Sequence, residues 1–273
     1  MPNPLYDNLI AKHATNDACF LNQAGKPTLS FRQFCERTSQ VANLLLKYGL
    51  HPGDRVAVQA EKTIEIVILY SATIQAGGVF LSLNTDYKKD EVTYFLKDAE
   101  PKIFVCDPYK VEDLKNVANQ VGSAILTVDA HGEGSLLSEA NQMSKIFSTV
   151  DRKPDDLAAL LYTSGTTGRS KGAMLTQNNL LSNAKTLKKL WHVTKSDILI
   201  HALPIFHTHG LFVALNTAML AAAKVNFIPK FDIDEIIEKM RASTLLMGVP
   251  TFYARLLADY RLTEKLTKSM RLF

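Results

Sequence analysis

A run of small polar residues in the middle of the chain combines the groups that bind phosphate. Residues 163–168 read Thr-Ser-Gly-Thr-Thr-Gly, six consecutive hydroxyl or glycine residues, and Lys171 follows closely. Glycine lets the backbone approach an anion and turn its N–H groups inward. The hydroxyls add donors, and Lys171 adds a full positive charge. We therefore predict a polyphosphate-binding loop rather than a plain Gly/Thr hairpin turn.

This loop differs from a Walker A motif, because no Gly-Lys-Ser/Thr occurs at the required spacing. A strand is predicted on each side of it, over 157–163 and 172–175. Phosphate binding would therefore depend on backbone amides and side chains, without the dipole of a following helix. The hydroxyl of Thr166 is the predicted Mg²⁺ ligand, since a hard cation prefers oxygen.

Two histidines and an arginine further along the chain are further candidates for a site. His207 and His209 form an H-x-H pair after Pro204. No third metal ligand lies nearby, so a structural role at a helix start is favoured over metal binding. Arg255 lies one turn into a helix predicted to begin at Pro250. It is either a surface arginine or a fixed cation whose planar fork suits a carboxylate.

The composition excludes several classes of protein. The 273 residues are 47% hydrophobic and 21% charged, which argues against disordered, collagen-like and coiled-coil chains. Lys plus Arg total 31 against 27 Asp plus Glu, and no dense basic run occurs, so nucleic acid is not an expected partner. The longest apolar stretch, 211–223, is too short to span a bilayer. The three separated cysteines indicate a reducing compartment, and we predict a cytoplasmic protein that does not insert into membranes.

The candidate residues lie within a regular alternation of predicted helices and strands. Strands are predicted over 55–59, 79–83, 103–106, 124–128, 157–163, 172–175, 198–202, 225–228 and 244–249. Helices are predicted over 31–45, 64–72, 89–97, 111–120, 180–187, 211–222 and 233–240, with one more from Pro250. This rhythm predicts an α/β fold with doubly wound, largely parallel sheets and flanking helices. Residues 129–154 are polar and turn-rich and are predicted to form a surface connector. Residues 270–273 resemble the opening of another buried strand.

The run 162–172 resembles the phosphate loop of the acyl-adenylate-forming enzymes, which include acyl-CoA synthetases, luciferases and the adenylation domains of peptide synthetases. Ser170 stands where that family often has proline. The segments 53–56, 77–79 and 204–207 resemble the same family in the expected order. Within it, the blocks 203–210 and 247–253 are most similar to malonyl-CoA synthetases.

The resemblance implies two half-reactions and a larger protein. ATP and a carboxylate give an acyl-adenylate and pyrophosphate, and coenzyme A then displaces AMP to form a thioester. The chain matches about the first half of the family, so we expect a partial N-terminal AMP-binding domain: a first α/β subdomain over about 1–150 and an incomplete second one over 151–273. The adenine-binding block, the ribose-binding aspartate and the C-terminal domain with its lysine are expected to lie beyond it. Without them, this fragment alone is expected to be inactive.

The predicted residue roles follow from the motif and the resemblance together. Lys171 and His207 are the predicted catalytic residues, and His207 with Arg255 would contact the acyl substrate. The predicted ATP-binding residues are Thr163, Ser164, Gly165, Thr166, Thr167, Gly168 and Lys171.

Three functions remain open. The first is an AMP-forming carboxylate–CoA ligase using ATP, Mg²⁺ and coenzyme A, with malonate as its acid. The second is a ligase for another small acid, or an adenylation domain that serves a carrier protein. The third is a nucleotide-binding module without catalytic competence. An incomplete sheet would leave apolar surface exposed near the C-terminus, through which the chain could self-associate.

Overall fold

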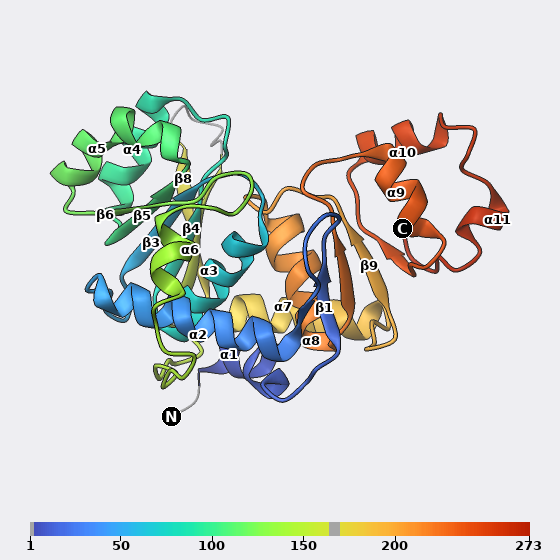
Figure 1. Cartoon of the computed structure of the whole chain (residues 1–273), viewed down its shortest axis with the longest axis horizontal. Coiled ribbons are helices and arrows are strands. Elements are labelled where there is room, and N and C mark those ends of the chain that lie inside the picture. Colours follow the sequence, from blue (N-terminus) through green and yellow to red (C-terminus); the bar gives the residue numbers. More distant parts are fainter. Residues whose placement is uncertain (1–2, 164–169) are drawn as a thin grey trace. The chain divides into compact units, whose positions relative to one another are not determined.

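The computed structural model describes residues 3–163 and 170–273, which divide into two compact units (Figure 1). The first unit comprises Met1–Ala11 and Cys35–Leu181, and the second comprises Lys12–Phe34 and Ser182–Phe273. These units do not coincide with the predicted division near residue 150. Two strands that follow residue 150 pair into the sheet of the first unit, and two strands near the N-terminus pair into the sheet of the second.

The first unit contains a six-stranded sheet in the order β6-β5-β3-β4-β7-β8. Its strands are β3 (Arg55–Gln59), β4 (Val79–Ser82), β5 (Ile103–Cys106), β6 (Ala124–Thr127), β7 (Leu157–Thr163) and β8 (Lys171–Thr176). All neighbours are parallel except β8, which runs antiparallel to β7. The associated helices are α1 (Pro4–Leu9), α2 (Phe31–Lys47), α3 (Ile64–Gln75), α4 (Lys89–Ala99), α5 (Val111–Gln120), α6 (Ser135–Ala140) and α7 (Gln177–Leu190), and the boundary between the units falls within α2 and α7.

Helices cover both faces of this sheet (Figure 1). Successive side chains of a strand point to opposite faces. On β4, the ring of Phe80 contacts Tyr70 of α3 at a centroid distance of 5.3 Å. The next residue, Leu81, instead joins a buried cluster with Phe95 of α4 and Leu114 of α5. The predicted doubly wound α/β architecture is therefore confirmed for this unit.

The second unit is built on a five-stranded sheet in the order β11-β9-β10-β1-β2. Its strands are β1 (Cys19–Asn22), β2 (Leu29–Ser30), β9 (Ile198–His201), β10 (Lys224–Phe227) and β11 (Leu245–Leu246). Only the β1–β2 pair is antiparallel. The helices are α8 (Asn216–Ala221), α9 (Ile233–Met240), α10 (Pro250–Leu257) and α11 (Glu264–Thr267), together with a π-helix over His209–Leu215. One face packs Ile200 against Ile236 of α9 and Leu256 of α10.

Local sequence signals account for several element boundaries. The Thr63 hydroxyl accepts a hydrogen bond from the Ile66 N–H and caps α3, as expected of threonine before an apolar run. Thr176 and Asn179 bond each other's backbone N–H groups at the start of α7, which is the reciprocal pattern of a capping box. The predicted strands over 55–59, 103–106 and 157–163 and the predicted helices over 111–120 and 233–240 are confirmed at both ends.

Other predictions are corrected. The connector predicted over 129–154 contains α6, because Leu136 and Ala140 lie four residues apart and are both buried. The helix predicted over 211–222 begins at His209, and its first seven residues are a π-helix. The strand predicted over 244–249 is reduced to the two residues of β11. β1 and β2 were not predicted.

The end of the chain forms a sheet contact but is not buried. The Leu246 N–H donates to the Leu272 carbonyl at 3.0 Å, in a parallel bridge of Leu272 to Leu245. Phe273 is 54% exposed, and Leu257 and Tyr260 are also exposed. The prediction of apolar surface near residue 273 is confirmed, whereas self-association through it remains a prediction. Within residues 3–163 and 170–273, every helix is too short or too polar to cross a bilayer.

Candidate active site

The predicted phosphate loop joins two paired strands of the first unit. Thr163 ends β7 and lies opposite Lys171, the first residue of β8, in the antiparallel ladder. The strand–loop–strand arrangement predicted from the sequence is therefore confirmed. The predicted ligands at residues 164–168, including Thr166, lie outside the described residues. Because β7 is parallel to β4, Thr163 lies at the carboxyl edge of the sheet, where open α/β sheets bind ligands.

The two described loop residues share one side of the hairpin. Tyr162 and Leu160 pack toward the α4–α5 cluster, so the alternate position, Thr163, points to the opposite face. Residues directly opposite each other in a ladder share a face, so Lys171 points the same way as Thr163. Both residues are exposed. The Lys171 ammonium is thus presented to solvent beside the predicted phosphate-binding segment.

The other two predicted site residues belong to the second unit and come from one edge of its sheet. β9 and β11 are adjacent parallel strands. The loop that carries His207 follows β9, and α10, which carries Arg255, follows β11. On the other side of β9, β10 leads to Phe231. The carboxyl ends of three neighbouring parallel strands therefore lead to His207, Arg255 and Phe231.

The loop that carries His207 is held by close backbone packing. A Cβ on Gly210 would lie 2.1 Å from the Pro204 carbonyl oxygen, so only glycine fits there. The Gly210 carbonyl is 2.9 Å from Nε2 of His201, which is fully buried. His207 itself is exposed, and its ring centroid lies 4.4 Å from that of Phe206.

Partial removal from water lowers the pKa of His207 below its ordinary value. The imidazole is consequently neutral at pH 7. A neutral ring has one N–H donor and one acceptor nitrogen. It can therefore donate to a carboxylate without the strong attraction of a full positive charge.

The Arg255 guanidinium is exposed and stacks on an aromatic ring. Its carbon lies 4.4 Å from the centroid of Phe231, whose own ring lies 4.3 Å from that of Phe252. Within the described parts of the chain, Arg255 forms no ion pair. Stacking restrains the plane of the guanidinium and leaves its N–H edges available for a carboxylate. No sequence signal indicated that the Phe231 ring would pack against Arg255.

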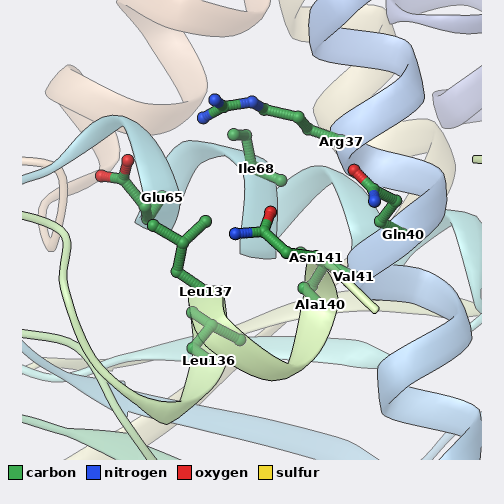
Figure 2. Close-up of a pocket in the computed structure, with 9 residues that line it drawn as sticks. All are labelled: Arg37, Gln40, Val41, Glu65, Ile68, Leu136, Leu137, Ala140 and Asn141. Atoms are coloured by element: carbon green, nitrogen blue, oxygen red, sulfur yellow. The ribbon is translucent and has the colours of Figure 1, made fainter. Parts of the chain in front are cut away.

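Two cavities among the described residues lie apart from the predicted site residues. One lies in the first unit among α2, α3 and α6, and at about 20 Å³ it holds about one water molecule. Figure 2 shows its lining residues, which are Arg37, Gln40, Val41, Glu65, Ile68, Leu136, Leu137, Ala140 and Asn141. The other, about 480 Å³, lies in the second unit. It is lined by largely apolar residues of α9 and α10, by Leu262 and Phe273, and by the polar residues Thr263, Glu264 and Thr267. Neither is lined by Lys171, His207 or Arg255.

Comparison with known proteins shows the family to which the chain belongs. Residues 9–273 match the AMP-binding enzyme family, and the chain belongs to that family. The resemblance to acyl-adenylate-forming enzymes and the predicted fold class are both confirmed.

Particular relatives are similar over most of the chain. MatB from Rhodopseudomonas palustris, crystallised with ATP, is 50% identical with a TM-score of 0.97, covering 100% of this chain and 54% of that one. A malonate–CoA ligase of Arabidopsis thaliana is 31% identical over 232 residues, covering 80% of this chain and 38% of the relative. An oxalate–CoA ligase of the same plant is 33% identical over 226 residues, covering 81% of this chain and 44% of the relative. The chain thus spans about half or less of each relative.

Proposed function

We propose that this protein is an ATP-dependent carboxylate–CoA ligase whose acid is malonate. The observation that carries the proposal is the 50% identity, along the whole chain, to a relative crystallised with ATP. Similarity to a malonate–CoA ligase supports the choice of acid. Because the chain spans 54% of MatB, we propose the activity for the protein of the complete reading frame and expect residues 1–273 alone not to complete it.

In the first half-reaction, a carboxylate oxygen of the acid forms a bond to the α-phosphorus of ATP. The bond from that phosphorus to the bridging oxygen breaks, and pyrophosphate leaves with the electron pair. Residues 163–168 would hold the phosphates, and Lys171 would neutralise the charge that develops on pyrophosphate. Its exposed position opposite Thr163 supports this role.

A magnesium ion and coenzyme A complete the proposed set of small molecules. Oxygen donors suit Mg²⁺, which is the chemistry of the proposed ligand Thr166, and the ion would supply positive charge beside the phosphates. In the second half-reaction, the coenzyme A sulfur bonds to the acyl carbon as the carbon–oxygen bond to AMP breaks. We propose a cytoplasmic location, which the free thiols of Cys19, Cys35 and Cys106 support.

Malonate has two carboxylates with different requirements. One must attack phosphorus and cannot be bound tightly by a cation. We propose that the neutral His207 ring contacts this one, and that Arg255 pairs with the other through two hydrogen bonds. The stacked guanidinium, which has no partner carboxylate among the described residues, supports this second role. An acid with a single carboxylate would leave Arg255 unpaired in the complex.

The test is a panel of acids given to the protein of the complete reading frame. Pyrophosphate release is measured with malonate, methylmalonate, oxalate, acetate and butyrate, and the coenzyme A thioester is identified by mass. Preference for malonate, with methylmalonate tolerated, is the expected result. Preference for oxalate would support the second candidate, which the 33% identical oxalate–CoA ligase favours. Adenylate without thioester would indicate a carrier-protein adenylation domain, and no adenylate with any acid would overturn the proposal.

A further inference from the structure

Both ends of the predicted phosphate loop are attached to one helix. The Tyr94 hydroxyl of α4 donates to the Ser170 carbonyl at 3.1 Å, immediately before Lys171. The Tyr162 hydroxyl, immediately before Thr163, donates to the Asp98 carboxylate of α4 at 2.5 Å. Tyr94 and Asp98 lie four residues apart and therefore on one face of the helix.

Aromatic packing fills the space between α4 and the hairpin. The Tyr162 ring lies 4.4 Å from Phe95 and 6.4 Å from Tyr94, measured between centroids. Tyr87 extends this group through a contact of 4.9 Å with Phe95. A Cβ on Gly172, which is paired with Tyr162, would lie 3.6 Å from the Tyr162 ring, so the two strands and the ring are in close contact. Burial and the Asp98 carboxylate both raise the pKa of Tyr162, so the hydroxyl keeps its proton and remains a donor.

α4 packs against the face of the hairpin opposite to Thr163 and Lys171. Tyr162 faces the helix, while Thr163 and Lys171 point to the other face. Tyr94 and Asp98 therefore bond the hairpin on the side away from Lys171. Their hydrogen bonds restrain the hairpin at Ser170 and Tyr162, the residues that precede Lys171 and Thr163.

We propose that Tyr94 and Asp98 are positioning residues that hold Lys171 and Thr163 in place for adenylate formation, an inference that rests on the proposed function. Displacing Lys171 weakens its contact to a leaving group whose charge develops only in the transition state. Such a displacement lowers kcat more than it changes KM for ATP. Each of the two hydrogen bonds joins residues that are about 70 positions apart in the sequence.

The test compares two tyrosines of the same aromatic group in the protein of the complete reading frame. Tyr94→Phe removes the bond to Ser170 and keeps the ring. Tyr87→Phe is the matched control, because its hydroxyl makes no hydrogen bond within the described residues. We expect Tyr94→Phe to lower kcat for malonate-dependent pyrophosphate release roughly tenfold, with KM for ATP and the melting temperature close to those of Tyr87→Phe. Amide hydrogen exchange at residues 170–174 should be faster in Tyr94→Phe alone.

A second pair of variants tests the Asp98 bond. Asp98→Asn keeps an acceptor oxygen and should retain most of the activity, whereas Asp98→Ala should lose as much as Tyr162→Phe. The double variant Asp98→Ala/Tyr162→Phe should be no worse than either single variant, because both remove one bond.

The outcomes separate this inference from the proposed function. If wild type is active and Tyr94→Phe behaves as Tyr87→Phe in both kcat and hydrogen exchange, the positioning role is wrong while the function stands. If the kcat of Tyr94→Phe falls only in parallel with its melting temperature, the residue is merely structural and the inference is overturned. If wild type and the Tyr87→Phe control form no adenylate with any acid, the proposed function fails and the positioning role fails with it.

Discussion

The guanidinium of Arg271 holds the Asp197 carboxylate by two parallel hydrogen bonds. Nε lies 2.8 Å from Oδ1, and Nη2 lies 2.6 Å from Oδ2. The same group donates to the carbonyls of Trp191 and His192 at 2.8 and 3.1 Å. The last described strand contact, at Leu272, is thereby attached to the turn between α7 and β9.

Loss of this pair should destabilise the second unit. Asp197 is 4% exposed, so Arg271→Ala leaves a nearly buried carboxylate without its cation. We expect a loss of about 2 kcal/mol in the free energy of unfolding, below the full cost for a buried pair because Arg271 is partly exposed. Urea denaturation measures it. The control, Arg32→Ala, breaks the exposed pair with Asp17 and should cost less than about 1 kcal/mol. Equal losses in the two variants would contradict the prediction.

The same pair predicts an acid-dependent loss of stability. Burial alone would raise the pKa of Asp197, but hydrogen bonds from Arg271, Thr244 and Thr194 outweigh it and lower the pKa from 3.8 to about 2. A carboxyl group whose pKa is depressed in the folded state stabilises that state above its ordinary pKa, and this contribution disappears as the pH falls toward 2. Asp197→Asn should therefore be less stable than wild type at pH 6. The difference in unfolding midpoint should shrink between pH 4 and pH 2, and a constant difference would show that ionisation of Asp197 is not involved.

Removal of the loop lysine should impair rate more than affinity. Lys171→Ala in the protein of the complete reading frame is expected to lower kcat for pyrophosphate release about 100-fold, with a smaller change in KM for ATP. Steady-state kinetics with saturating malonate measure both constants. Lys195→Ala removes another exposed lysine and should behave as wild type. An unchanged kcat in Lys171→Ala would remove this residue from the proposed mechanism.

Arg255 should determine the choice between acids with one and two carboxylates. Arg255→Leu is expected to lower kcat/KM for malonate about 100-fold or more and to leave that for butyrate unchanged or raised. Arg241→Leu changes another exposed arginine of the second unit and serves as the control. Undiminished use of malonate by Arg255→Leu would make Arg255 an ordinary surface residue.

His207 should act as a neutral hydrogen-bonding group. His207→Ala is expected to lower kcat/KM for malonate roughly tenfold, and His207→Gln, which keeps an N–H donor, should lose less. The lowered pKa places protonation of the ring below pH 6.5, so wild-type activity should be level above pH 7. At lower pH, protonation of His207 should reduce wild-type activity, and this contribution to the decrease should be absent in His207→Gln. His51→Ala is the control, and a His207→Ala variant with the activity of this control would exclude the role.

Much of the fold could be predicted from local sequence alone, and the candidate phosphate loop was also found there. Short apolar runs bounded by turn residues define β3 and β5 to the residue, because such strands are buried on both faces. The apolar run of β7 defines that strand as well, although only Ala158 and Ala159 of it are buried. The Thr63 cap and the hydroxyl–glycine run at 163–168 are equally local signals. The antiparallel pairing of β7 with β8 follows from two strands joined by a short segment, whereas the register that places Thr163 opposite Lys171 was not predicted.

Long-range pairing decided what local sequence could not. β1 is a four-residue strand that is recognisable only through its partner β10. Its residue Leu21 lies opposite Val225, about 200 positions later in the sequence. Because of this pairing, residues 12–34 belong to the second unit. Likewise, Phe231 supports Arg255, and Tyr94 bonds Ser170, through side chains brought together by neighbouring strands and helices. The periodicity of a segment reports which of its faces is buried. It carries no information about which distant residue covers that face, and the packing of the folded chain determines this.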